Sequence, residues 1–267
     1  MAKSKTKGAK PKKHHAAVEP MLEFGNRWDY SPAPESTPVP LKKRYSLYIG
    51  GKFVAAKSGR VFRSVNPATG RKLTDIAAGD REDVDLAVKA ARKALTGPWG
   101  KMPAAERGKL IYRIARMVQE RSRELAILET MDGGKPIKES RDVDLPLVAA
   151  HFFYHAGWAD KLEYAFPGKK PQPIGVCGQV IPWNFPLMMA AWKLAPALAC
   201  GNTVILKPAE TTSVSALHLA EIIADAGLPD GVVNIVTGKG STGAAVVQPP
   251  GVDKVAFTGS TRVGKQI

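Results

Sequence analysis

An asparagine between two prolines is the first group in this 267-residue sequence that could take part in chemistry. Asn184 lies in the run PWNFP, residues 182–186, where the proline rings restrict the backbone. An amide held in this way could donate an N–H to an oxygen that gains negative charge during a reaction. It could equally serve only as the N-cap of the helix that follows, and the residues by themselves leave both interpretations open.

A lysine and a glutamate, Lys207 and Glu210, stand three residues apart at the end of an apolar run. At the mouth of a strand, such a carboxylate could accept hydrogen bonds from the hydroxyls of an adenosine ribose, and the ammonium could donate to them. The alternative is an exposed loop with a weak surface ion pair.

Two glycine-rich turns could hold a nucleotide. Residues 238–243, GKGSTG, fit the pattern GxGxxG, but no acidic residue follows Asp253, so the dinucleotide-binding fingerprint is incomplete. Residues 257–264, FTGSTRVG, offer Gly259 for close approach and backbone N–H groups at a helix start, which can bind phosphate. As an isolated pattern, this second turn could also be an ordinary capped helix.

The remaining reactive side chains indicate no further site. Cys177 lies in an apolar strand and Cys200 ends a helix, and neither has a neighbouring His or Lys in the sequence, so both are expected to be buried small hydrophobes. His151, His155 and His218 sit on apolar helices at core or boundary spacings. No metal ligand set and no catalytic triad is predicted.

The elements that must position these groups alternate strand and helix beyond Pro173. The expected pairs of strand and helix are 174–181 with 186–200, 203–207 with 212–226, 232–236 with 241–247, and 254–258 with a helix from about 260. Glycines at 201 and 227 end the first two helices. This order predicts an open, doubly wound, mostly parallel α/β sheet whose ligand crevice lies at the carboxyl ends of its strands.

The first half of the chain predicts strands and then helices. Residues 45–55 and 61–77 read as two pairs of short strands around turn signals, and together they are expected to form a small antiparallel layer. One helix is expected to start after Asp80, a long one to run from Pro103 to Gly134, and another to cover residues 140–162.

Charge and composition bound the class of protein. The formal charge is +15, and residues 1–13 hold six lysines and no acid, so residues 1–44 are expected to form a basic, Pro-rich, disordered tail before one domain at 45–267. Nucleic acid is not an expected partner, because no binding motif accompanies the lysines. No apolar run reaches the roughly 18 residues of a membrane span and no secretory signal is present, so we expect a soluble, cytoplasmic protein.

Three motifs in the printed order resemble the aldehyde dehydrogenase superfamily: PWNFP at 182–186, CGNTVILKPAE at 200–210 and FTGS at 257–260. The resemblance covers about residues 45–267, including YIGG at 48–51 and NPATG at 66–70. It implies a Rossmann-like cofactor domain of the aldehyde dehydrogenase type. Only the basic tail lies outside it.

The resemblance also implies a role for each turn. Asn184 would be the side-chain half of an oxyanion hole, Lys207 and Glu210 would hold the adenosine ribose, Gly240 would lie along the adenine, and the turn at 259–264 would face the pyrophosphate. The cofactor would be NAD, with NADP as the alternative, and Glu210 favours NAD. The residues expected around the cofactor are Ile181, Pro182, Trp183, Asn184, Lys207, Glu210, Gly240, Thr258, Gly259, Ser260, Val263 and Gly264.

In this family a cysteine thiolate attacks the aldehyde, the thiohemiacetal gives hydride to the nicotinamide, and a glutamate-activated water releases the acid. The motifs that carry this cysteine and glutamate are missing here, and the last expected helix, 261–267, has no stop signal. We therefore expect a fragment that keeps the cofactor site and cannot turn over alone. The alternative is a noncatalytic nucleotide-binding or interaction protein.

The complete family member is expected to take an aldehyde and to form a homo-oligomer. The segment 164–172 looks shorter than the crossing hairpin that the family uses for assembly, which puts the oligomer in question for this chain.

Overall fold

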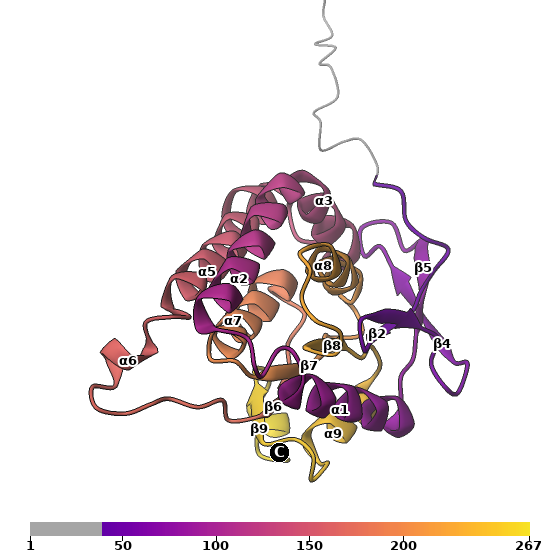
Figure 1. Cartoon of the computed structure of the whole chain (residues 1–267). Coiled ribbons are helices and arrows are strands. Elements are labelled where there is room, and N and C mark those ends of the chain that lie inside the picture. The colour runs from indigo at the N-terminus through magenta and orange to yellow at the C-terminus, as the bar shows by residue number, and fades with distance from the viewer. Residues whose placement is uncertain (1–38) are drawn as a thin grey trace, which may run out of the picture.

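The structure, a computed structural model, describes residues 39–267, so most of the expected tail at 1–44 lies outside the described residues. The first described residues are packed against the rest of the chain: Val39 is buried, and the Lys42 ammonium donates to Glu221 Oε1 at 2.6 Å. Six strands form the main sheet and three form a smaller one beside it (Figure 1).

The main sheet has the strand order β3-β2-β8-β7-β6-β9. Its strands are β2 (Leu47–Ile49), β3 (Lys52–Val54), β6 (Val176–Val180), β7 (Thr203–Lys207), β8 (Val233–Ile235) and β9 (Lys254–Phe257). The four strands β8, β7, β6 and β9 are parallel, and β2 and β3 extend the sheet in antiparallel fashion. The predicted doubly wound, mostly parallel α/β sheet is confirmed.

The small sheet has the order β1-β5-β4, with β1 (Arg44–Tyr45), β4 (Val61–Val65) and β5 (Lys72–Ala77). Of residues 45–55, only Tyr45 joins this layer, through β1, which runs parallel to β5. The prediction was wrong for the rest, because the hairpin of β2 and β3 pairs with β8 through Tyr48 and Ile235. All three residues of β2 are buried. A strand buried on both faces needs cover above and below, and α1 (Arg81–Thr96) and α8 (Val214–Asp225), which lie on opposite faces of the main sheet, both contact β2.

Helices cover both faces of the main sheet. They are α1 (Arg81–Thr96), α2 (Ala104–Glu120), α3 (Ser122–Gly133), α4 (Ile137–Glu139), the π-helical segment η2 (Ser140–Asp144), α5 (Leu145–Trp158), α6 (Leu162–Ala165), α7 (Pro186–Ala199), α8 (Val214–Asp225), α9 (Gly240–Val247) and α10 (Thr261–Gly264). Figure 1 shows α2, α3, α5, α7 and α8 on one face and α1 with α9 on the other.

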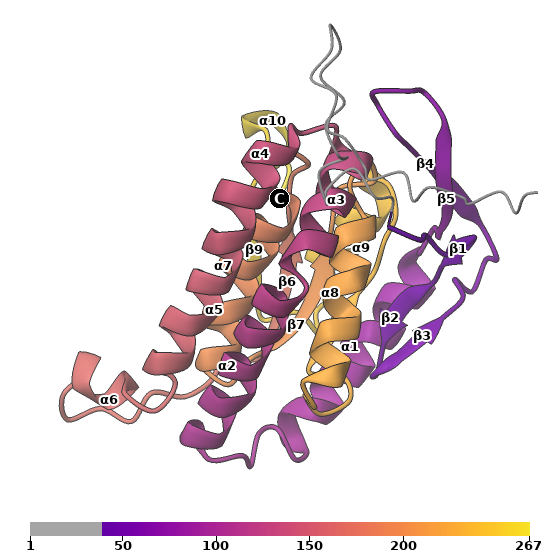
Figure 2. The same ribbon diagram turned by 90° about the horizontal axis from the view of Figure 1, so that it is seen from above.

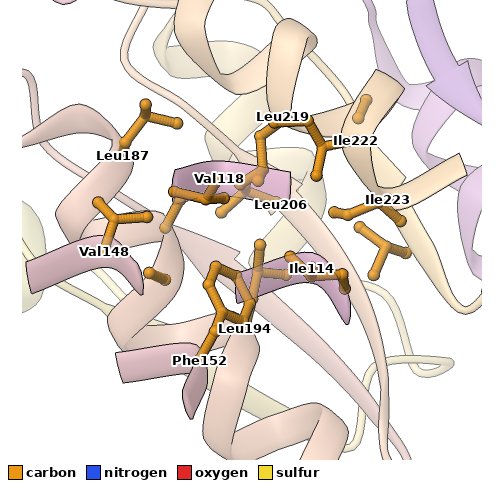
Figure 3. Packing of buried hydrophobic residues seen from close by; sticks show 14 of the residues in the cluster. Ile114, Val118, Val148, Phe152, Leu187, Leu194, Leu206, Leu219, Ile222 and Ile223 are labelled. Carbon is orange, nitrogen blue, oxygen red and sulfur yellow. The ribbon is translucent and has the colours of Figure 1, made fainter. Parts of the chain in front are cut away.

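Successive residues of β7 point to opposite faces of the main sheet and pack into two separate core clusters. Val204 and Leu206 pack into the larger cluster under the helices of the first face, and Ile205 packs into the smaller cluster with α1. Figure 3 shows the larger cluster, where Ile114, Phe152 and Leu194 meet from α2, α5 and α7. All three are fully buried. This core fixes β6 and β7, whose carboxyl ends carry two of the candidate turns.

Two helix predictions need correction. The helix expected from Pro103 to Gly134 is two helices, because the backbone turns at Arg121 (φ −100°, ψ 16°) between α2 and α3. The helix expected over 140–162 begins as the π-helical η2 and ends at Trp158, before a segment that leads away from the body and carries α6 (Figure 1). The expected glycine stops are confirmed: Gly201 and Gly227 adopt φ of 80° and 83°.

A buried polar chain ties the first strand to the helices. Tyr45 Oη lies 2.8 Å from His218 Nε2, and Glu124 Oε1 lies 3.0 Å from His218 Nδ1. Burial lowers the pKa of His218, although Glu221 and Glu124 oppose this. A neutral ring fits both contacts, because Nδ1–H then donates to Glu124 while Nε2 accepts from Tyr45.

Candidate functional site

The four candidate turns lie at one edge of the main sheet, because each follows the carboxyl end of a parallel strand. From β6 the chain passes to β7 and β8 on one side and then returns to β9 on the other side of β6. Such a reversal of strand order opens a crevice between the turns on either side of it. In Figure 2, α10, which follows β9, lies at the same end of the molecule as α4.

The turn after β6 presents Asn184 to solvent. The N-cap of α7 is Phe185 and no side chain caps it, so the interpretation of Asn184 as the N-cap was wrong. Among the described residues Asn184 makes no hydrogen bond, and the neighbouring Trp183 is 64% exposed. Pro182 is half-buried, whereas Ile181 is buried in the core and can offer a ligand only its backbone.

The turn after β7 pairs a buried cation with an exposed carboxylate. Lys207 is 5% exposed, and its Nζ lies 3.6 Å from Glu210 Oε2. Burial lowers the pKa of Lys207, and Glu210 partly offsets this. The alternative of an exposed surface pair therefore does not hold for Lys207, which is buried, and only Glu210 is exposed. An ammonium with one acceptor at this distance keeps N–H donors for a ligand, and the exposed Glu210 keeps acceptors, which suits a pair of hydroxyl groups.

The turn after β8 contains the GxGxxG pattern, whose glycines serve packing as well as access. A Cβ on Gly238 would lie 2.1 Å from Thr242 Oγ1, and this hydroxyl donates to the Gly79 carbonyl at 2.6 Å. The first glycine is thus required where the strand meets α9. Gly240 begins α9 and is exposed.

The turn after β9 is the most exposed of the four. Thr258, Gly259, Ser260, Val263 and Gly264 are all exposed. Thr258 Oγ1 accepts from the Lys193 ammonium at 2.6 Å, and Ser260 Oγ accepts from the Val263 N–H at 3.4 Å. The second contact makes Ser260 the N-cap of α10, as the capped-helix alternative supposed.

Two clefts at this edge share Trp183 and Gly133. The larger of the two, of about 560 Å³, is lined by residues that include Asp132, Trp183, Glu210 and Lys239. The smaller, of about 310 Å³, is lined by residues that include Trp183 and Asn184. The structure thus brings Trp183 close to both Glu210 and Asn184. The other expected cofactor residues line neither cleft: Ile181, Pro182, Lys207, Gly240, Thr258, Gly259, Ser260, Val263 and Gly264.

A larger cavity of about 750 Å³ lies away from these turns, between α7, β6, β9 and the segment around α6. Both cysteines line it, and burial raises the pKa of the Cys177 and Cys200 thiols. A raised pKa disfavours the reactive thiolate, as expected from the sequence. Cys177 is buried as predicted, whereas Cys200 is only half-buried.

Charged residues behind Asn184 were missed by sequence reasoning. Glu129, Gly133, Gly134 and Lys135 line the smaller cleft with Asn184. A signal existed: Glu129 lies four residues after Leu125 and so shares its face of α3, which is the buried one.

Metal and membrane roles find no support in the described residues. Within 39–267, no group of three His, Cys, Asp or Glu residues could hold a metal ion. No helix in the same range is long and apolar enough to cross a membrane.

Sequence comparison finds relatives along most of this chain. It is 48% identical over 246 residues to retinal dehydrogenase 2 of Homo sapiens, covering 88% of this chain and 47% of that protein. It is 49% identical over 237 residues to the mitochondrial benzaldehyde dehydrogenase of Antirrhinum majus, covering 85% of this chain and 44% of that protein. The chain spans about half the length of these curated relatives.

Solved structures agree with the sequence comparison. The NAD⁺ complex of aldehyde dehydrogenase from Bacillus cereus superposes with a TM-score of 0.80 at 43% identity, over 86% of this chain and 50% of that one. The model of the aldehyde dehydrogenase family matches residues 53–267. The chain belongs to the aldehyde dehydrogenase family.

Proposed function

We propose that this chain supplies the cofactor-binding part of an aldehyde dehydrogenase that oxidises an aldehyde to a carboxylic acid with NAD(P). The observation that carries the proposal is the pair of Lys207 and Glu210 at the end of β7. It lies beside the crevice at β6, whose neighbouring turn carries the exposed Asn184. The NAD⁺ bound to the related Bacillus cereus enzyme supports the choice of cofactor.

Each turn has a task in this proposal. Glu210 accepts from the ribose hydroxyls and Lys207 donates to them, and the carboxylate favours NAD because it repels the extra phosphate of NADP. Gly240 and the turn at 258–264 lie along the adenine and the pyrophosphate. Asn184 donates an N–H to the oxyanion of the substrate. When bound, the nicotinamide accepts a hydride.

The thiol that attacks the aldehyde is the part this chain does not supply. The sequence has two cysteines, and both lie in the larger cavity with raised pKa values. We infer that the chain alone binds NAD and does not turn over. The same observation favours a second candidate, a noncatalytic nucleotide-binding or interaction protein.

Calorimetry with NAD tests the cofactor site. The wild-type chain is expected to bind NAD more tightly than NADP. Glu210→Gln should weaken NAD binding by roughly tenfold, because one charge-assisted hydrogen bond contributes about 1.5 kcal/mol, and it should reduce the preference over NADP. Glu163→Gln, an exposed carboxylate on α6, is the control and should bind as the wild type. A wild-type chain without NAD binding would contradict the proposal.

An aldehyde-dependent assay of NADH formation tests the missing thiol. Sustained turnover by the 267-residue chain would show that its nucleophile is present after all. NAD binding without turnover by this chain, together with turnover by the same chain extended through the next downstream codons, would favour the dehydrogenase over the noncatalytic candidate.

The cytoplasmic location and self-association also remain proposals. The relative from Antirrhinum majus is named as mitochondrial. Cell fractionation separates the two locations: the proposal expects this chain in the cytosol, and its recovery from mitochondria would contradict the proposal. Light scattering of the purified chain measures its oligomeric state, and a single monomeric species would contradict self-association.

A further inference from the structure

The turn that carries Asn184 has no side-chain hydrogen bonds of its own to hold it. Asn184 makes none among the described residues, and α7 has no side-chain cap at Phe185. An amide that is to meet an oxyanion must be held within a fraction of an ångström. Its position must therefore come from residues that pack against the turn.

Glu129 on α3 supplies the cap that α7 lacks. The side chain is 2% exposed, and its Oε1 accepts from the Leu187 N–H at 2.7 Å and from Ser215 Oγ at 3.3 Å. Leu187 is the second residue of α7, so its N–H is one of the four at the helix start that have no partner within the helix. A carboxylate also complements the positive end of the helix dipole.

Lys135 holds the same turn from a second direction. Its Nζ lies 3.7 Å from the centre of the Phe185 ring, and it also donates to the buried Asp144 on η2. A cation over a ring face is attracted to the electron-rich face of the ring, and more strongly where both are shielded from water. Asn184 thus lies next to a residue fixed by Lys135 and three residues before one fixed by Glu129.

Asp132, one turn further along α3, caps α8 in the same way. Its Oδ2 accepts from the Val214 N–H at 2.9 Å, and Ser213, the N-cap of α8, makes no side-chain cap. Helix α3 therefore presents two carboxylates to the starts of two successive helices. This second cap gives a matched control for the first.

We propose that Glu129 is a positioning residue for Asn184: by capping α7, with Lys135 on Phe185, it fixes the turn from which the amide reaches its ligand. The inference rests on the proposed function, because that function is what gives Asn184 its task. The contacts themselves do not depend on it.

The protonation of Glu129 provides the readout. Burial raises the pKa of Glu129 to about 7, and the charged groups around it act in opposite directions, Asp144 raising the pKa and Lys135 lowering it. On α8 and α7 its partners are the neutral Ser215 hydroxyl and the Leu187 N–H. A protonated carboxyl accepts more weakly, so the turn should respond as the proton is lost.

The experiment is NMR of the whole chain between pH 5 and 9, with selective labels on asparagine and leucine nitrogen. The sequence has five asparagines, and Asn184→Asp identifies the Asn184 side-chain amide. In the wild type, this amide and the Leu187 backbone amide should shift together with a midpoint near pH 7. In Glu129→Gln, which keeps the shape and the acceptor, both shifts should be lost.

Asp132→Asn should leave the coupled shift of Asn184 and Leu187 intact. Phe185→Leu, which removes the ring beneath Lys135, should move the Asn184 amide and leave the Leu187 response in place. Asn184 shifts that persist in Glu129→Gln, or an Asn184 amide that does not respond to pH in the wild type, would overturn the proposal. Calorimetry with NAD on the same samples reports on the proposed function separately.

Discussion

Replacing Glu129 by glutamine should change how the stability of the chain depends on pH. Burial raises the pKa of Glu129 from 4.5 to about 7. Between these two values the folded state holds a proton that the unfolded state has released, so the free energy of unfolding of the wild type falls as the pH rises through this window. Glutamine cannot ionise, so the free energy of unfolding of Glu129→Gln should lack this decrease with rising pH.

The magnitude follows from the width of the window. At about 1.4 kcal/mol for each pKa unit, the ionisation of Glu129 costs the fold roughly 2–3 kcal/mol between pH 5 and pH 8. The difference in the free energy of unfolding, variant minus wild type, should therefore rise by that amount. Asp132, whose pKa burial raises to about 6, and His218, whose pKa burial lowers, also titrate, but they are present in both proteins and cancel.

Urea unfolding followed by circular dichroism at pH 5, 6, 7 and 8 measures this difference. Equal m-values in the two proteins would show that the unfolded states are comparable. Glu163→Gln, at an exposed site, should give a difference that does not change with pH. A flat difference for Glu129→Gln as well would show that the carboxyl titrates normally, which would refute the reasoning from its burial.

Three further predictions concern the rest of the molecule. Tyr45→Phe removes the hydroxyl that His218 accepts from, and urea unfolding should show a loss of about 1 kcal/mol. Burial lowers the pKa of His218, so below about pH 6.5 the folded chain binds fewer protons at this ring than the unfolded chain. The free energy of unfolding should therefore fall as the pH drops below that value. In thermal melts at pH 5 and pH 8, His218→Gln should show a smaller difference in melting temperature between the two pH values than the wild type. Leu194→Ala opens a cavity in the core of Figure 3, and the same urea assay should show a loss of about 2–5 kcal/mol.

The sequence predicts best where local pattern and burial coincide. The strands and helices from β6 to α10 follow from short apolar runs and from glycines that stop helices, and the structure has them within a few residues of the expected ends. The hairpin of β2 and β3 was placed in the wrong sheet, because short-range pairing says nothing about which edge a hairpin joins. Its partner β8 lies almost two hundred residues away in the chain, at Ile235 against Tyr48.

The residues of the candidate site also fall into those that the sequence predicts and those that it does not. Asn184, Lys207 and Glu210 could be found because each lies at the end of an apolar strand or in the turn that follows it. Glu129 could not be assigned a partner, since its contact with Leu187 joins segments 58 residues apart. The buried state of Lys207 was also missed, because a cation at the end of a strand is exposed or buried according to the helices packed around it.

The two carboxylates of α3 have a mechanical consequence. Glu129 caps the start of α7, which follows the Asn184 turn, and Asp132 caps the start of α8, which follows the turn of Lys207 and Glu210. Both caps come from the C-terminal end of α3, where Glu129 and Asp132 lie three residues apart. In the proposed cofactor site, a ligand that displaced the turn of Lys207 and Glu210 would therefore also displace the start of α7 through the end of α3, and the Asn184 turn would move with it.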